Sequence, residues 1–120
     1  MAAQATAFLA AAEELLVPDL VVAELVYVLE SYYEAPREAV AEWARAVIGF
    51  PAVVVTQPEI LMRALEVYER HRLDFAEAYL VAHAEASGVG VVASFDRAIR
   101  RVGSIRLITP GTPEPTPGSD

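Results

Sequence analysis

Three short apolar runs, each separated from the next by a stretch with helical character, constrain the fold of this chain more than any other feature. They lie at residues 52–56, 91–94 and 105–109 and are rich in valine and isoleucine. A continuous run of β-branched residues is typical of a strand buried on both faces, as in a parallel sheet covered by helices. The order strand, helices, strand, helix, strand therefore predicts a three-layer α/β fold, with a short parallel sheet of about three strands flanked by helices.

Helices are predicted for the segments between and around these runs. Pro18 and Pro36 suit the first turn of a helix, whereas Gly49 and Gly88 suit the end of one. The expected helices span residues 2–16, 19–33, 36–48, 59–70, 74–87 and 96–102. We place one domain at residues 1–109, and we expect the proline-rich tail at residues 110–120 to be disordered, because it has little to bury.

The composition excludes several classes of protein. Among its 120 residues there is no cysteine, so neither a disulfide framework nor a thiolate metal site is possible. No apolar run reaches the roughly 18 residues that a membrane span needs, so we expect a cytoplasmic protein without a membrane partner. The formal net charge of -8 argues against a protein that wraps nucleic acid by charge alone. An enzyme that reaches nucleic acid through metal ions is not excluded.

Glu24 stands out because apolar residues surround it in the stretch VVAELVYVL. A carboxylate buried there would need a hydrogen-bonding partner, a shifted pKa or a bound cation. The alternative is that Glu24 faces solvent or pairs with an arginine.

Glu77 and Asp96 each have a structural explanation beside a functional one. Asp74 followed by Glu77 matches a D-x-x-E capping box, in which Asp74 caps the start of a helix. Leu80, one turn further on, indicates that Glu77 also lies along the packed side of that helix. Asp96 can cap the helix that follows it, but it comes directly after a predicted strand, where ligands bind in parallel α/β sheets.

Taken together, Glu24, Glu77 and Asp96 point to a bound cation. Clustered carboxylates repel one another unless a cation lies between them, and a site made of oxygen atoms suits Mg²⁺ or Mn²⁺. Such ions activate water and stabilise phosphoryl transfer. We therefore expect the three carboxylates to lie within roughly 10 Å of each other.

The segments VPDLVVAELVYVLES, AVVVT and LDFAEAYLVAHAEASGVGVVASFDRAI, in this order, resemble the PIN domain and, within it, the VapC-type toxins. The resemblance covers residues 6–110. It implies an Mg²⁺- or Mn²⁺-dependent ribonuclease that is the toxin of a toxin–antitoxin pair, with RNA as substrate, an antitoxin as partner and a homodimer as the assembly. Glu24, Glu77 and Asp96 would be the catalytic metal ligands, Ser94 would lie beside them, and water would be the nucleophile. Asp74 is a weaker candidate ligand.

Two departures from the family qualify this prediction. The family opens with a strand that ends in Asp, whereas this chain begins with what resembles the family's second helical segment. The family also has Asp where this chain has Glu77. We therefore expect the first strand and its Asp to be absent, and RNA cleavage to be weak or absent even with Mn²⁺. The alternative function is a catalytically impaired relative that serves as a binding or dimerisation module.

Two further expectations follow from the resemblance. Residues 53–55 and 91–93 should close up and pair directly, in place of the missing strand. The alternatives are that a second copy supplies a segment across a dimer interface, or that residues outside this sequence fill the gap. The aromatic residues Tyr32, Tyr33 and Trp43 suit an interface, although a core position for Trp43 is equally compatible with the sequence.

Overall fold

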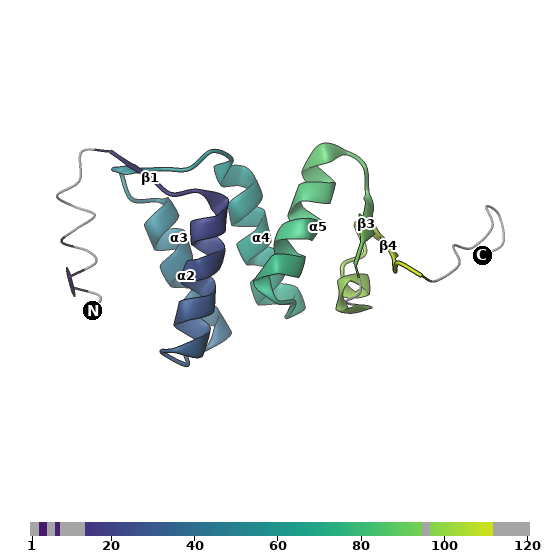
Figure 1. Ribbon diagram of the computed structural model, residues 1–120, viewed down its shortest axis with the longest axis horizontal. Helices are drawn as coiled ribbons and strands as arrows, with labels where there is room; N and C mark the ends of the chain where they lie inside the picture. The colour runs from purple at the N-terminus through teal and green to yellow at the C-terminus, as the bar shows by residue number, and fades with distance from the viewer. Residues whose placement is uncertain (1–2, 5–6, 8–13, 95–96, 112–120) are drawn as a thin grey trace.

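The computed structural model describes residues 3–4, 7, 14–94 and 97–111. The predicted α/β class is confirmed, and the helices and strands follow one another in the expected order (Figure 1). The elements are β1 (Leu15–Leu16), α2 (Asp19–Ser31), α3 (Arg37–Ile48), β2 (Val53–Val54), α4 (Pro58–His71), α5 (Phe75–Ser87), β3 (Val91–Ala93), the 3-10 helix η1 (Arg97–Arg101) and β4 (Arg106–Ile108). Residues 112–120, most of the predicted tail, lie outside the described residues.

The end of the first predicted helix is wrong, because Leu15 and Leu16 form a strand. β1 pairs with β2 in parallel, with Leu15 opposite Val53 and Leu16 opposite Val54. The Leu15 N–H donates to the carbonyl of Ala52 at 2.7 Å. Backbone pairing with a distant segment therefore overrides the helical propensity of leucine here.

The direct pairing expected between residues 53–55 and 91–93 is also wrong. β2 pairs with β1, and β3 pairs with β4 in parallel, so the described strands form two separate two-stranded sheets. In Figure 1 the two sheets lie on opposite sides of the helices, with α4 and α5 between them. The strands are therefore held apart by packed helices.

The core is built around α4, whose apolar residues recur at the spacing of one helical face. Leu61, Leu65 and Tyr68 are fully buried in it. Helix α4 packs against α3 on one side and α5 on the other. Buried small residues let these helices approach closely: Ala41 and Ala44 on α3, Ala64 on α4, and Ala78 and Ala82 on α5.

Arg37 and Tyr68 join the start of α3 to the end of α4. Arg37 Nη1 donates to the carbonyls of Tyr68 at 2.8 Å and Leu73 at 2.5 Å, and its guanidinium lies 4.2 Å from the centre of the Tyr68 ring. The Tyr68 hydroxyl donates to the Glu30 carboxylate at 2.5 Å. Burial, together with this hydrogen bond, raises the pKa of Tyr68. The Arg37 side chain thereby satisfies the Tyr68 carbonyl, which the end of α4 leaves without a partner in the helix.

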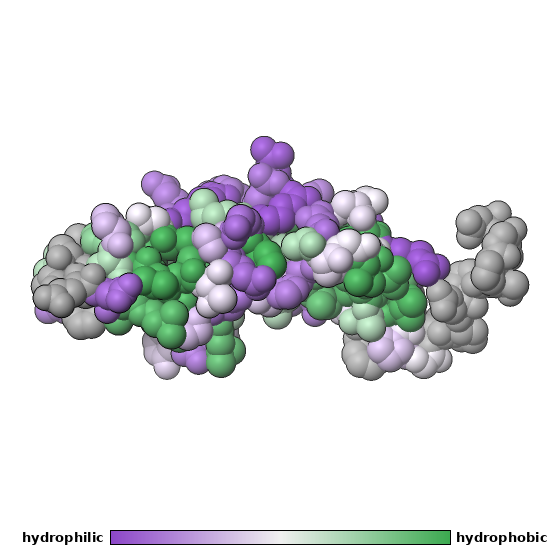
Figure 2. Space-filling model, turned by 90° about the horizontal axis from the view of Figure 1, so that it is seen from above, coloured by the Kyte–Doolittle hydropathy of each residue, from purple (hydrophilic) through white to green (hydrophobic). Residues whose placement is uncertain are grey.

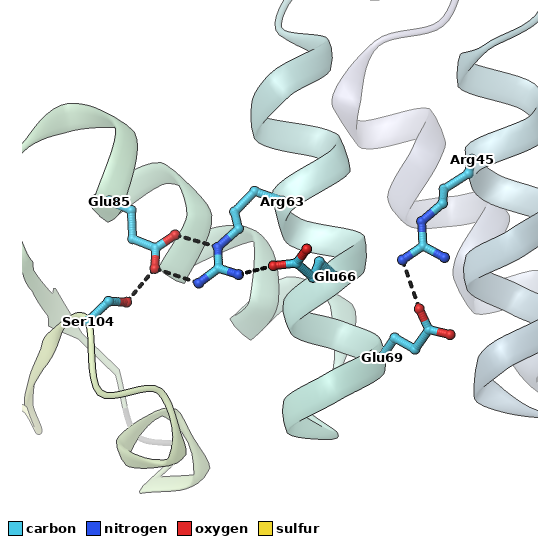
Figure 3. Close-up of polar contacts among 6 residues, drawn as sticks. All are labelled: Arg45, Arg63, Glu66, Glu69, Glu85 and Ser104. Carbon is cyan, nitrogen blue, oxygen red and sulfur yellow. Dashed lines mark hydrogen bonds and ion pairs between the residues drawn. The ribbon is translucent and has the colours of Figure 1, made fainter.

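Arg63 links α4 to α5, and its partner Glu85 extends the link to the loop before β4 (Figure 3). Its guanidinium donates two hydrogen bonds to Glu85, at 2.7 and 2.9 Å, and a third to Glu66. Glu85 also accepts a hydrogen bond from the Ser104 hydroxyl. Elsewhere in Figure 3, Arg45 of α3 pairs with Glu69 of α4 at 2.8 Å. These contacts link α3 to α4, and α4 to α5 and the loop before β4.

One face of the molecule exposes large apolar side chains over β1, β2 and α2. Leu16 and Val54, which are neighbours in the β1–β2 register, are exposed, as are Leu20 and Tyr27 of α2. Figure 2 shows a hydrophobic area over this end of the molecule. We call these four residues the α2 face. None of the described helices is long and apolar enough to cross a membrane.

Candidate active site

The start of α5 is fixed by the predicted Asp74 cap. Asp74 is the N-cap residue, and its Oδ1 accepts a hydrogen bond from the Glu77 N–H at 2.9 Å. This contact satisfies one of the N–H groups that a helix N-terminus leaves without a partner. The predicted cap is confirmed, and it places Glu77 in the first turn of α5.

Glu77 reaches from α5 to the end of β3. Its Oε2 accepts a hydrogen bond from the hydroxyl of Ser94 at 2.8 Å. Ser94 directly follows β3, is only 8% exposed, and donates its backbone N–H to the carbonyl of Ile108 at 3.0 Å. The hydroxyl that holds Glu77 is therefore itself held by the β3–β4 sheet. Two of the residues singled out from the sequence are in direct contact.

Glu24 is exposed on α2, so the buried position considered for it is wrong and the solvent-facing alternative is correct. Helix α2 is apolar on almost all sides. Val22 and Val26, which are near Glu24 in the sequence, are buried in the core. Within the described part of the chain, no arginine pairs with Glu24 or Glu77. Neither carboxylate is neutralised there by an ion pair.

A contact that the sequence did not reveal ties α2 to α5. The Tyr79 hydroxyl donates a hydrogen bond to the carboxylate of Asp19, in the first turn of α2. Burial, reinforced by this hydrogen bond, raises the pKa of Tyr79 to about 12. The Tyr79 ring also packs edge-to-face on His83, with ring centres 5.3 Å apart. The two helices that carry Glu24 and Glu77 are thus linked directly.

The convergence of three carboxylates stays a prediction. Asp96 lies outside the described residues. Among the residues that are described, no group of three or more His, Asp or Glu side chains lies close enough to hold a metal ion. The structure brings together Glu77, Asp74 and Ser94 around the start of α5, and it places Glu24 on a neighbouring helix.

Comparison with known proteins decides the family. The family model of the PIN domain matches residues 1–105. The chain belongs to the PIN domain family. This PIN domain is similar to a "VapC ribonuclease" of Aquifex aeolicus (strain VF5), with 29% identity over 91 residues, which cover 76% of this chain and 67% of that protein. No solved structure matches it. The family resemblance derived from the sequence motifs is confirmed.

Proposed function

We propose that this PIN domain is an Mg²⁺- or Mn²⁺-dependent endoribonuclease, the toxin of a toxin–antitoxin pair, acting in the cytoplasm. The observation that carries the proposal is the hydrogen bond between Glu77 and Ser94. It fixes a carboxylate at the carboxyl end of a parallel strand, which is where α/β sheets bind ligands. RNA is proposed as the substrate because a relative of this chain bears the name of a ribonuclease.

The proposed ligands suit a hard divalent cation. Glu24, Glu77 and Asp96 offer oxygen atoms only, which is the donor set that Mg²⁺ and Mn²⁺ prefer. Glu77 uses Oε2 to accept the Ser94 hydrogen bond, and its other oxygen has no partner among the described residues. Asp74 is the weaker candidate, because its Oδ1 already caps α5. A bound cation would lower the pKa of a water molecule and offset the charge of the phosphate.

The residues of the chain have separate roles in this proposal. Glu24, Glu77 and Asp96 would hold the cation, and the cation would offset the charge of the scissile phosphate. Ser94 is a positioning residue, because it orients the Glu77 carboxylate through a hydrogen bond. Support of this kind around a metal ligand typically changes metal affinity or activity by about 10–100-fold. Water is the nucleophile, so no side chain of the protein forms a covalent intermediate.

Cleavage of a labelled RNA in the presence of Mn²⁺ tests the proposal. Glu77→Gln should reduce the rate by about 100-fold or more, because it removes a charged ligand. Glu42→Gln is the matched control, since Glu42 is an exposed acid on α3. Chelation by EDTA should abolish cleavage. A rate that survives both EDTA and Glu77→Gln would contradict the proposal.

A catalytically impaired PIN domain that serves as a binding or dimerisation module is the second candidate. The apolar α2 face favours it, because monomeric soluble proteins rarely expose contiguous apolar surface without a function. Mn²⁺ binding without any RNA cleavage would favour this candidate over the enzyme.

We propose a basic antitoxin segment as the partner of the α2 face. Residues 14–36 contain five acidic residues and no basic one, and the acids are Glu14, Asp19, Glu24, Glu30 and Glu34. A partner with apolar and cationic side chains would match both properties. Co-expressed antitoxin should therefore dissociate from a Leu20→Asp variant, and retention at full strength would contradict this assignment.

We also propose a homodimer that uses exposed aromatic side chains at the α2–α3 turn and on α3. Tyr32 is 78% exposed, Tyr33 48% and Trp43 47%, so these three side chains can reach a second copy, and the core position considered for Trp43 is wrong. Light scattering of the purified chain measures the assembly directly. A mass of one chain at high micromolar concentration would contradict the dimer.

A further inference from the structure

The nine arginines of this acidic chain fall into two groups. Three of the nine make ion pairs or hydrogen bonds within the helical core: Arg37, Arg45 and Arg63. The other six all lie in two short segments, residues 70–72 and 97–106. A chain with a formal net charge of -8 therefore concentrates its remaining positive charge in two places.

The fold brings these two segments together. Arg101 Nη1 donates to the carbonyl of His71 at 3.4 Å and to that of Arg72 at 3.3 Å, at the C-terminus of α4. Figure 1 shows η1 and the C-terminal end of α4 at the same, lower edge of the molecule. We call Arg70, Arg72, Arg100 and Arg101 the basic edge. All four are exposed.

No carboxylate of the described residues pairs with the basic edge. The two acids next to its α4 half in the sequence are occupied, since Glu69 pairs with Arg45 and Asp74 caps α5. The negative end of the α4 dipole offsets only part of the repulsion between four arginines. Arg72 also occupies the left-handed C-cap position, with φ 56°, where glycine is the less strained residue. Capping explains Arg101, whereas Arg70, Arg72 and Arg100 make no ion pair with any residue that the structure describes.

The basic edge adjoins the candidate active site. Arg72 lies two residues before Asp74, the N-cap of the helix whose first turn carries Glu77. Ser94 directly follows β3, and η1 begins three residues after Ser94. In Figure 1, α5 starts at the lower edge of the molecule, and β3 lies beside α5, above η1 at that edge. An anionic polymer bound along the basic edge would therefore pass beside Glu77 and Ser94.

We propose that the basic edge binds the phosphates of an RNA strand and positions that strand for the site at Glu77. The guanidinium group matches a phosphate with two parallel hydrogen bonds and stays charged at any physiological pH. The positioning role rests on the proposed ribonuclease function, whereas the binding itself needs neither metal nor cleavage. The net negative charge of the chain repels RNA, but salt screens charges beyond about 10 Å at 0.1 M, so that the contacts of a local basic cluster outweigh it.

Binding of a fluorescein-labelled single-stranded RNA of 15 nucleotides, followed by anisotropy in EDTA, tests the proposal without any cleavage. The test variant carries Arg70→Gln, Arg72→Gly and Arg100→Gln, in which glycine also relieves the left-handed position. It should bind at least about tenfold more weakly at low salt, and its salt dependence should be shallower by about two, since each phosphate contact on a single strand contributes about 0.7 to the slope. Arg45→Gln is the control and should bind as the parent does.

Several outcomes would overturn the proposal. One is that the parent chain fails to bind this RNA at low salt. Another is that the triple variant binds with the affinity and salt slope of the parent. Competition by an equally charged poly-aspartate as strong as that by RNA would assign the edge to an acidic protein. If the triple variant does not fold, as judged by circular dichroism, Arg100→Gln alone should lower the slope by about 0.7. Loss of cleavage with intact RNA binding would reject the ribonuclease and leave the basic edge in place.

Discussion

At the scale of single residues, the contact between Tyr79 and Asp19 gives the protein a dependence on alkaline pH. Burial, together with the hydrogen bond to Asp19, raises the pKa of Tyr79 to about 12. A tyrosine in an unfolded chain titrates near 10. Because the folded-state pKa is the higher one, the stabilisation is complete below about pH 10 and is lost as the pH rises towards 12.

Tyr79→Phe should therefore lower the free energy of unfolding by about 1 kcal/mol at pH 8, the usual contribution of one hydrogen bond. The difference between the parent and Tyr79→Phe should shrink between pH 10 and 12. Urea unfolding at several pH values measures it, and subtracting the variant cancels the similar effect of Tyr68, whose pKa is also raised by burial. A difference that stays constant up to pH 12 would contradict the assignment.

Single residues also show which contacts could be predicted from the sequence and which could not. The Asp74 cap was predictable, because a capping box is a local pattern of four residues. The exposure of Glu24 was not, since an apolar helix does not reveal from its sequence which side faces solvent. The hydrogen bond between Tyr79 and Asp19 could not be predicted from any local pattern, because the two residues are 60 positions apart in the sequence.

At the scale of elements, the link between α4, α5 and the loop before β4 depends on the ionised form of Glu85. The hydrogen bond from Arg63 is the main reason that the pKa of Glu85 lies below its usual value. A lowered folded-state pKa means that the stabilisation is present above the unfolded value of 4.5 and is lost as the pH falls through the folded one.

Glu85→Gln should accordingly lower the melting temperature at pH 7 by about 4 °C, which corresponds to about 1 kcal/mol for a partly exposed pair in a small domain. The difference should vanish as the pH falls well below 4. Thermal unfolding at pH 7 and pH 3 measures it, with Glu42→Gln as a control that should melt as the parent does at both values. An equal loss at both pH values would show that the shape of Glu85, and not its charge, stabilises the link.

The boundaries of most elements could be predicted because they are set by local chemistry. Pro58 begins α4, Gly88 follows the end of α5, and the apolar runs at residues 52–56, 91–94 and 105–109 contain β2, β3 and β4. The strand β1 could not be predicted, because Leu15 and Leu16 follow an alanine-rich segment and leucine, like alanine, has a high helix propensity. Their strand conformation comes from pairing with β2, a tertiary contact that no local pattern reveals.

At the scale of the whole molecule, the fold separates surfaces of different chemistry. The β1–β2 sheet and α2 carry an apolar and acidic surface, whereas α4 and η1 meet in the basic edge. The candidate site lies next to the basic edge, where α5 begins and β3 ends. The α/β class followed from the order of the apolar runs, but the division into two sheets did not. It depends on how α4 and α5 pack, which the sequence pattern leaves open.

The central claim is that Glu77, held by Ser94, is a ligand of a divalent cation. Titration of the purified chain with Mn²⁺, followed by the electron paramagnetic resonance signal of the free ion, tests it without any assumption about substrate. The parent chain should remove the free-ion signal. Ser94→Ala should weaken binding by about tenfold, Glu77→Gln should weaken it further, and Glu42→Gln should leave it unchanged. Binding of Mn²⁺ by Glu77→Gln with the affinity of the parent would contradict the claim.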